Sequence, residues 1–209
     1  MVVAVTNLKG GVGKTIIAQN LAVCLAHMGY SVCLVDTDTN QNSLSWSGVR
    51  DTELPNILTV GSTEPKAVSK QVSLLSDSHD FVIIDGTPSL SEMTTRIILA
   101  SEMLLIPILP AANDLRAMSQ FLERYEQAKE FKDEIPAYFI LNQFQGYSIQ
   151  NSVKEALTEF EIPLMESTFR NRVAYMEASA DGKGVFEWSD DKAATEAANL
   201  TKEVIELIS

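Results

Sequence analysis

Seven residues near the N-terminus have the types and the spacing of a phosphate-binding loop. They are Lys9, Gly10, Gly11, Val12, Gly13, Lys14 and Thr15. Glycines let the backbone turn so that successive N–H groups point at phosphate oxygens, and a helix that starts at the loop adds the positive end of its dipole. Lys14 is expected to reach the β- and γ-phosphates of a nucleotide, and the Thr15 hydroxyl to bind Mg²⁺. Leu8 stands where such loops usually begin with glycine.

Three aspartates follow apolar runs, at positions where a metal shell would need them. Asp85 ends the run 81–84, while Asp36 and Asp38 follow the run 31–35. A carboxylate at the carboxyl edge of a parallel sheet faces the phosphates, so Asp85 is expected to hold Mg²⁺ through a water molecule, with Asp36 supporting the same shell. Asp38 lies two residues further into the loop and is expected to orient the attacking water. The alternative is that these acids cap turns or are solvated.

Such a site requires strands that end together at one sheet edge, and the sequence contains the elements for it. Continuous apolar runs are typical of strands covered by helices on both faces. They lie at 2–6, 31–35, 81–84, 103–109 and 138–141, and helical patterns lie at 15–27, 65–76, 91–100, 114–129, 148–160 and 192–208. This alternation predicts an α/β fold with a doubly wound, mainly parallel sheet flanked by helices.

The 209 residues contain no internal repeat, low-complexity tract or linker, so we expect one domain that spans 1–209. The segment 40–63 is polar and weakly periodic, and we expect a loop there with a short helix at 43–49. Cys24 and Cys33 lie in apolar segments, which favours buried, reduced thiols in a cytoplasmic protein. The apolar run 97–112 is interrupted too often to span a bilayer, and the N-terminus does not resemble a signal peptide.

The motifs quoted above carry a resemblance to a known family. KGGVGKT, DTD and the run FVIIDGTPSL resemble the ParA/MinD family of deviant Walker A ATPases. The similarity continues weakly through Arg172-Val-Ala-Tyr-Met-Glu-Ala and then Gly182-Lys-Gly-Val-Phe-Glu187. A chain that starts directly at the first strand is similar to short ParA-type partition ATPases that lack an N-terminal DNA-reading domain. The resemblance implies a P-loop NTPase fold.

The resemblance also implies an ATP-driven homodimer with a defined set of site residues. In the family, the lysine at the position of Lys9 crosses to the partner's nucleotide, and the residue at Asp38 positions the hydrolytic water. The loop from Gly10 to Ile16 would bind ATP and Mg²⁺, and Asn142 resembles the residue that contacts adenine. The alternative for Asn142 is a plain turn residue. The sequence contains no NKxD-type guanine motif, which is consistent with ATP.

Two departures from the family pattern affect this site. Ile16 stands where a second threonine is usual, so a side-chain bond to the α-phosphate is lost and only the backbone N–H remains. Thr39 and Asn40 replace the usual Pro and Gln after Asp38. We expect this replacement to loosen the loop.

The leading functional hypothesis is an ATPase that positions a plasmid, a chromosome region or a protein cluster. The family implies a centromere-binding or adaptor protein as partner, with nonspecific DNA bound in the ATP state. The net charge of −12 excludes a broadly basic DNA-binding surface, and residues 150–209 contain 6 Lys or Arg against 12 Asp or Glu. Arg170 and Arg172 are therefore the main candidates for a local DNA patch. A second candidate stripe contains Arg116, Arg124, Lys129 and Lys132.

Other classes remain as alternatives at this stage. A MinD-like protein that associates with membranes would need a basic amphipathic C-terminal helix, whereas residues 199–209 contain one Lys and two Glu. We therefore expect the C-terminal helix to pack in the core, and no membrane partner. An iron–sulfur reductase would need exposed paired cysteines, which Cys24 and Cys33 do not provide. An ATP-dependent metabolic ligase on the same scaffold is the remaining alternative.

Overall fold

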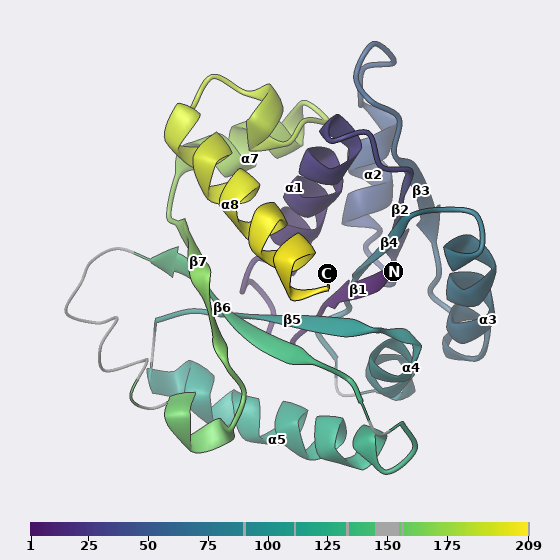
Figure 1. The fold of residues 1–209 in the computed structure, drawn as a ribbon, viewed down its shortest axis with the longest axis vertical. Coiled ribbons are helices and arrows are strands. Elements are labelled where there is room, and N and C mark those ends of the chain that lie inside the picture. The colour runs from purple at the N-terminus through teal and green to yellow at the C-terminus, as the bar shows by residue number, and fades with distance from the viewer. Residues whose placement is uncertain (90, 111, 133, 145–154, 156, 209) are drawn as a thin grey trace.

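The computed structural model shows a seven-stranded parallel sheet with helices on both faces (Figure 1). It describes residues 1–89, 91–110, 112–132, 134–144, 155 and 157–208. The strands follow the order β3-β2-β4-β1-β5-β6-β7. Their bounds are β1 Val2–Val5, β2 Val32–Asp36, β3 Leu58–Gly61, β4 Phe81–Asp85, β5 Met103–Ile108, β6 Ala137–Phe144 and β7 Leu164–Arg170.

The helices divide between the two faces of the sheet, and each group covers its own apolar core. One face carries α1 (Lys14–His27), α2 (Asn42–Gly48), α7 (Val173–Ala180), the short η2 (Val185–Glu187) and α8 (Asp191–Leu207). The other carries α3 (Pro65–Ser76), α4 (Glu92–Ala100), α5 (Ala112–Lys129) and η1 (Thr158–Phe160). Alternate strand residues supply the two cores: Val3 and Val5 face α1, whereas Val2 and Ala4 face the opposite layer.

Helix α1 is the most deeply buried of the helices on its face of the sheet, which it shares with α2, α7 and α8. Residues 17–26 are all buried, because the sheet lies on one side and α8 and α7 cover the other. A helix that is apolar all round must lie inside the fold, and this one has no amphipathic pattern. The phosphate-loop motif precedes α1 directly, so the loop rests on a rigid, fully packed element.

The predicted fold class is confirmed, although several elements differ from the expectation. Strand β3 lies inside the segment 40–63, where a loop with one helix was expected. The sequence pattern also did not predict β7 or α7. Strands β3 and β7 lie at the two edges of the sheet and are half exposed, so they lack the continuous apolar run of central strands. The predicted helix at 148–160 falls mostly outside the described residues, and η1 stands at its end.

Carboxylates from α8 cover the outer edge of β7. Glu203 accepts hydrogen bonds from the backbone N–H groups of Glu166 (2.7 Å) and Ser167 (2.9 Å), and Glu196 accepts one from that of Arg170 (3.0 Å). An unpaired strand edge is a template for association, and these side chains block it. Part of the acidic charge of the C-terminal region therefore has a structural role.

Helix α8 packs in the core, as expected for the C-terminal helix. Its buried residues are Ala193, Ala197, Leu200, Thr201 and Val204, and it lies against α1 and β7.

Cys24 and Cys33 are buried free thiols, which confirms their predicted place in the core. Among the described residues, no helix is both long enough and apolar enough to cross a membrane.

The opposite core provides a test of the packing. Phe121 of α5 is fully buried, whereas Phe131, just after that helix, is 80% exposed. We expect Phe121→Ala to lower the free energy of unfolding by about 3–5 kcal/mol, because it leaves a cavity, and Phe131→Ala to change it by less than ~0.5 kcal/mol. Urea unfolding followed by circular dichroism measures both values. Equal effects of the two substitutions would contradict this assignment of the core.

Candidate functional site

The phosphate loop leaves β1 at the carboxyl edge of the sheet and is braced at its start by Asn7. The Asn7 side chain donates to the Pro107 carbonyl (2.7 Å) and accepts from the Lys9 N–H (3.0 Å), so the loop is tied to the end of β5. Gly11 and Gly13 have φ of 75° and 90°. A Cβ at Gly13 would lie 2.0 Å from Asn142 Nδ2, so this glycine is required by its conformation and by space.

Lys14 is a buried cation at the first turn of α1. Its Nζ donates to the Lys9 carbonyl oxygen (2.8 Å), and the residue is 6% exposed. Burial lowers the pKa of Lys14 to about 8, although the negative charges of Asp85 and Asp38 oppose that shift. Burial deprives this ammonium of water, and the negative charge of a phosphate group beside it would compensate for that loss.

Asp85 lies at the centre of the site, at the end of β4. Its Oδ1 accepts a hydrogen bond from the Thr15 hydroxyl (3.2 Å), and its Oδ2 accepts one from the Ser43 hydroxyl (2.8 Å). Burial raises the pKa of Asp85 to about 7, and neighbouring Asp36 adds to the rise, while the two hydroxyls and Lys14 oppose it. The neighbouring donors and Lys14 therefore do not fully stabilise the ionised form of this buried carboxyl.

The oxygen atoms of Thr15 and Asp85 form a donor set that suits Mg²⁺, which prefers hard oxygen ligands. Among the residues that the structure describes, no three His, Cys, Asp or Glu side chains gather into a metal cage. The ion would consequently share these two residues with phosphate oxygens and water, the usual arrangement for Mg²⁺ at a nucleotide. The predicted metal residues Thr15 and Asp85 are thus brought together.

Asp36 is paired directly with Asp85 in the register of β2 and β4, and it is fully buried. Its Oδ1 accepts from the Asp38 N–H (3.0 Å), while Oδ2 accepts from the N–H groups of Ser43 (2.8 Å) and Leu44 (3.0 Å). Burial raises the pKa of Asp36, and these three hydrogen bonds oppose the rise. Asp36 therefore lies beside the predicted metal site and orders the start of α2.

Asp38 is half-buried in the loop between β2 and α2. One of its carboxylate oxygens accepts hydrogen bonds from both the backbone N–H (2.9 Å) and the side-chain amide (3.0 Å) of Asn40. The expected loosening of this loop by Thr39 and Asn40 stays a prediction, and Asn40 does make these two local contacts with Asp38. The backbone N–H bond closes a small turn after Asp38, and the side-chain bond is the part that depends on asparagine.

Asn142, near the end of β6, braces the phosphate loop from the opposite side. Its Nδ2 donates to the Val12 carbonyl (2.7 Å), and its Oδ1 accepts from the Gln143 N–H (2.8 Å). It is 5% exposed, and it borders a small cavity of about 80 Å³ together with Gly13 and Ile16. The predicted contact with adenine stays a prediction. The bracing role was not foreseen, because a bond that spans 130 residues leaves no local pattern.

Arg170 and Arg172, the predicted DNA residues, differ in how free their charges are. Arg172 is ion-paired with Glu196, from both Nε (3.0 Å) and Nη2 (2.7 Å) to one carboxylate oxygen. Arg170 is exposed, with its guanidinium 6.0 Å from the centre of the Phe144 ring. The structure therefore places an available cation at Arg170 and a locally neutralised one at Arg172.

The second candidate stripe is engaged locally where its side chains are described. Lys129 pairs with Glu126 (3.1 Å), Lys132 donates to the Ser101 carbonyl (2.5 Å), and Arg124 donates to Thr95 (3.3 Å). The side chain of Arg116 lies outside the described part of the chain. The side chains of Arg124, Lys129 and Lys132 are thus bound to groups of the same chain.

Ser43, like Asn7, is a site residue that the sequence analysis did not predict. It bridges the two buried acids: its N–H donates to Asp36 and its hydroxyl to Asp85. The sequence predicted the short helix in which it lies, but a serine in a polar segment gave no sign of a contact 42 residues away.

Comparison with known proteins agrees with this geometry. The family model described as the CobQ/CobB/MinD/ParA nucleotide binding domain matches residues 3–185. The chain belongs to this family. It is 32% identical over 210 residues to the maintenance of carboxysome distribution protein A of Halothiobacillus neapolitanus, and the match covers 97% of this chain and 95% of that protein.

Solved structures show the same fold. Apo McdA from Cyanothece superposes with a TM-score of 0.82 at 16% identity, covering 97% of this chain and 98% of that one. The septum site-determining protein MinD from Pyrococcus horikoshii, complexed with Mg-ADP, gives a TM-score of 0.80 at 20% identity, covering 100% and 97%. The chain thus has the P-loop NTPase fold of the MinD/ParA group.

Loss of the buried ammonium should weaken nucleotide binding in this family member. We expect Lys14→Ala to reduce ATP affinity by roughly 10–100-fold, since charge-assisted hydrogen bonds contribute about 1.5–3 kcal/mol. Calorimetric titration measures the change, and Lys70→Ala, an exposed lysine on α3, is the control. Unchanged affinity in Lys14→Ala would remove the phosphate-loop assignment.

The raised pKa of Asp85 predicts a pH-dependent stability in the absence of metal. The folded chain keeps the Asp85 proton up to pH about 7, whereas the unfolded chain loses it near the ordinary value of 3.8. Between these values the folded state binds more protons, so its free energy of unfolding falls as the pH rises. Between pH 4 and pH 7, the free energy of unfolding of wild type should fall by a few kcal/mol relative to that of Asp85→Asn. Urea unfolding in EDTA measures this difference. A constant difference between the two proteins would contradict the shift.

Proposed function

We propose that this chain is a dimeric, ParA-type positioning ATPase that binds Mg²⁺ and ATP at the carboxyl edge of the sheet. The observation that carries the proposal is the buried Lys14 beside the Thr15–Asp85 oxygen pair, in a loop that also contains Lys9. The whole-length similarity to a carboxysome distribution protein favours positioning over other uses of the scaffold.

The residues of the site divide the work of ATP hydrolysis. Backbone N–H groups of the loop and the Lys14 ammonium would hold the phosphates, while Thr15 and Asp85 would hold Mg²⁺. When bound, the metal neutralises charge on the transferred phosphoryl group. Gly86 follows Asp85, where many ATPases have a glutamate, so the attacking water must be oriented by another group. Asp38 is held by Asn40 and close enough to Lys14 to influence its pKa, which supports that role.

Lys9 would complete the site across a two-fold axis. Its backbone is committed to its own loop, since its N–H binds Asn7 and its carbonyl binds Lys14. Lys14 already fills the usual lysine position in its own subunit, so a second lysine five residues earlier gains a purpose when it reaches the partner's phosphates. In a symmetric dimer both sites receive such a lysine, which acts as an arginine finger does.

The dimer would act in the cytoplasm and move a plasmid, a chromosome region or a protein cluster with the help of a centromere-binding or adaptor protein. Nonspecific DNA is the proposed track, which implies association with the nucleoid. The exposed Arg170 offers one local cation, and dimerisation doubles it. Because the net charge is −12, DNA binding should be weak, salt-sensitive and dependent on ATP.

Two other functions are less well supported. Helix α8 gives a MinD-like membrane association no support, since it packs in the core and its Glu196 and Glu203 accept hydrogen bonds from the backbone of β7. A metabolic ligase on the same scaffold would show ATP hydrolysis that rises with a small acid substrate. A positioning ATPase would instead respond to DNA together with its partner protein.

Removal of the water-orienting carboxylate should separate binding from hydrolysis. We expect Asp38→Ala to bind ATP with an affinity within about tenfold of wild type and to hydrolyse it at least ~100-fold more slowly, because the change acts on the transition state. Phosphate release and ATP titration give the two values, with the exposed Asp77→Ala as control. Wild-type turnover in Asp38→Ala would show that another group orients the water.

Loss of the crossing lysine should abolish dimerisation without abolishing ATP binding. We expect Lys9→Ala to bind ATP within about tenfold of wild type, a difference of ~1.4 kcal/mol, and to stay monomeric with ATP and Mg²⁺. It should also lose hydrolysis and ATP-dependent retention on DNA at low salt. Light scattering, phosphate release and filter binding test these points, and Lys66→Ala is the matched control on the exposed side of α3. A Lys9→Ala protein that dimerises normally with ATP would refute the cross-dimer role.

A further inference from the structure

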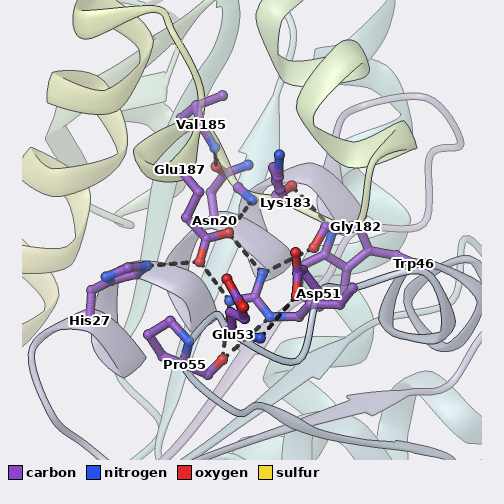
Figure 2. A network of polar contacts seen from close by, with 12 residues as sticks. Asn20, His27, Trp46, Asp51, Glu53, Pro55, Gly182, Lys183, Val185 and Glu187 are labelled. Carbon is purple, nitrogen blue, oxygen red and sulfur yellow. Dashed lines mark hydrogen bonds and ion pairs between the residues drawn. The ribbon is translucent and has the colours of Figure 1, made fainter.

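A buried ion pair joins the end of α2 to the segment between α7 and α8 (Figure 2). Arg50, two residues beyond α2, donates from Nη2 to Glu187 Oε1 (2.6 Å) and from Nη1 to Glu187 Oε2 (2.8 Å). The two side chains are 6% and 2% exposed. Glu187 also contacts His27 Nε2 (2.8 Å) and accepts from the Gly184 N–H (3.1 Å). Burial raises the pKa of Glu187, yet hydrogen bonds, that from Arg50 first, bring it below its ordinary value, so the carboxylate is ionised.

Side chains at the end of α2 bind backbone carbonyls of the second segment, and the two backbones approach closely at Gly182. Arg50 Nη1 donates to the Gly182 carbonyl (3.0 Å), and Trp46 Nε1 donates to that of Lys183 (3.2 Å). A Cβ at Gly182 would lie 2.6 Å from the Arg50 nitrogen, and its φ of 69° also favours glycine. The late motif Gly182-Lys-Gly-Val-Phe-Glu187 therefore forms a clasp, by which we mean residues 182–187, around the end of α2.

The clasp is fixed in turn to α1, the helix that carries the phosphate loop. Asn20 Oδ1 accepts from the Val185 N–H (2.7 Å), and Asn20 is buried. A Cβ at Gly184 would lie 2.9 Å from Val23 Cβ, so the clasp lies flush against α1. Through these contacts, the far end of α2 is held in a fixed position relative to the loop.

The near end of α2 presents Ser43 to the two buried acids. Its hydroxyl lies 2.8 Å from Asp85, and the N–H groups of Ser43 and Leu44 bind Asp36. Seven helical residues span about 10 Å, so α2 is a short rigid rod with one end in the clasp and the other at the metal site. A tilt at the Arg50 end would move the Ser43 hydroxyl away from Asp85.

We propose that Arg50 and Glu187 are positioning residues for the Asp36–Asp85 pair, acting through α2 on Ser43. The proposal rests on the nucleotide site described above. A buried ion pair adds little net stability compared with apolar residues, but its two-pronged geometry fixes orientation. Arg50 and Glu187 lie outside the phosphate loop, so their effect would appear in metal affinity rather than in the binding of metal-free nucleotide.

The test uses Arg50→Lys, which keeps the charge but loses the fork, and Glu187→Gln, which keeps the shape but loses the charge. Arg96→Gln, from the exposed ion pair with Glu92, is the control. We expect Arg50→Lys and Glu187→Gln each to raise, by roughly tenfold, the Mg²⁺ concentration at which the tightening of fluorescent ADP binding is half-maximal. Arg96→Gln should leave this concentration unchanged. Affinity for ADP in EDTA should stay at the wild-type value. Amide hydrogen exchange of residues 40–50 should accelerate without metal or nucleotide.

A double-mutant cycle separates positioning from general destabilisation. Ser43→Ala should raise the Mg²⁺ requirement by itself, and Arg50→Lys should add nothing to it in the double variant, because Ser43 transmits the effect. All titrations are run well below the melting temperature of the least stable variant. Additive effects of Ser43→Ala and Arg50→Lys would overturn the proposal and leave the nucleotide site intact. So would a lowered melting temperature with an unchanged Mg²⁺ requirement in both Arg50→Lys and Glu187→Gln. A wild-type protein that binds no nucleotide would overturn the proposed function and this inference together.

Discussion

Two carboxylates share one buried place at the edge of the sheet, and much of the site is arranged around them. Asp36 and Asp85 are directly paired at the ends of β2 and β4, and both are withdrawn from water. Like charges so placed repel each other and lose hydration. The surrounding chain offsets part of this cost, with backbone N–H groups on Asp36, the Thr15 hydroxyl on Asp85, and Ser43 on both. Each of these donors comes from an element whose position the fold must fix.

The compensation is incomplete, and that points to the ligand. Burial disfavours the charged forms of both Asp85, whose pKa rises to about 7, and Lys14, whose pKa falls to about 8. A divalent cation beside the acids and a triphosphate beside the lysine would supply the missing opposite charges. The same burial that disfavours these charges in the isolated chain would therefore favour binding of the metal and nucleotide proposed above.

The sequence could predict the parts of this arrangement that are local. Central strands read as apolar runs, the loop from Lys9 to Thr15 has a fixed spacing, and Asp36, Asp38 and Asp85 follow their strands directly. Short edge strands were missed, since half-exposed β3 and β7 lack an apolar run. Ser43, the bracing by Asn142 and the Arg50–Glu187 pair were missed because their partners lie 42, 130 and 137 residues away. Such contacts are set by the packing of the folded chain and leave no periodic signal.

The proton balance of metal binding tests the central claim most directly. If Asp85 is held partly protonated by burial, binding of Mg²⁺ and ADP near pH 7 must release that proton, because the metal needs the ionised carboxylate. Calorimetry in two buffers with different ionisation enthalpies counts the protons released, and subtracting the count for Asp85→Asn removes protons that come from the nucleotide. The account predicts that wild type releases more protons than Asp85→Asn at pH 7 and that this excess disappears well above pH 8. Equal proton release by the two proteins at every pH would contradict it.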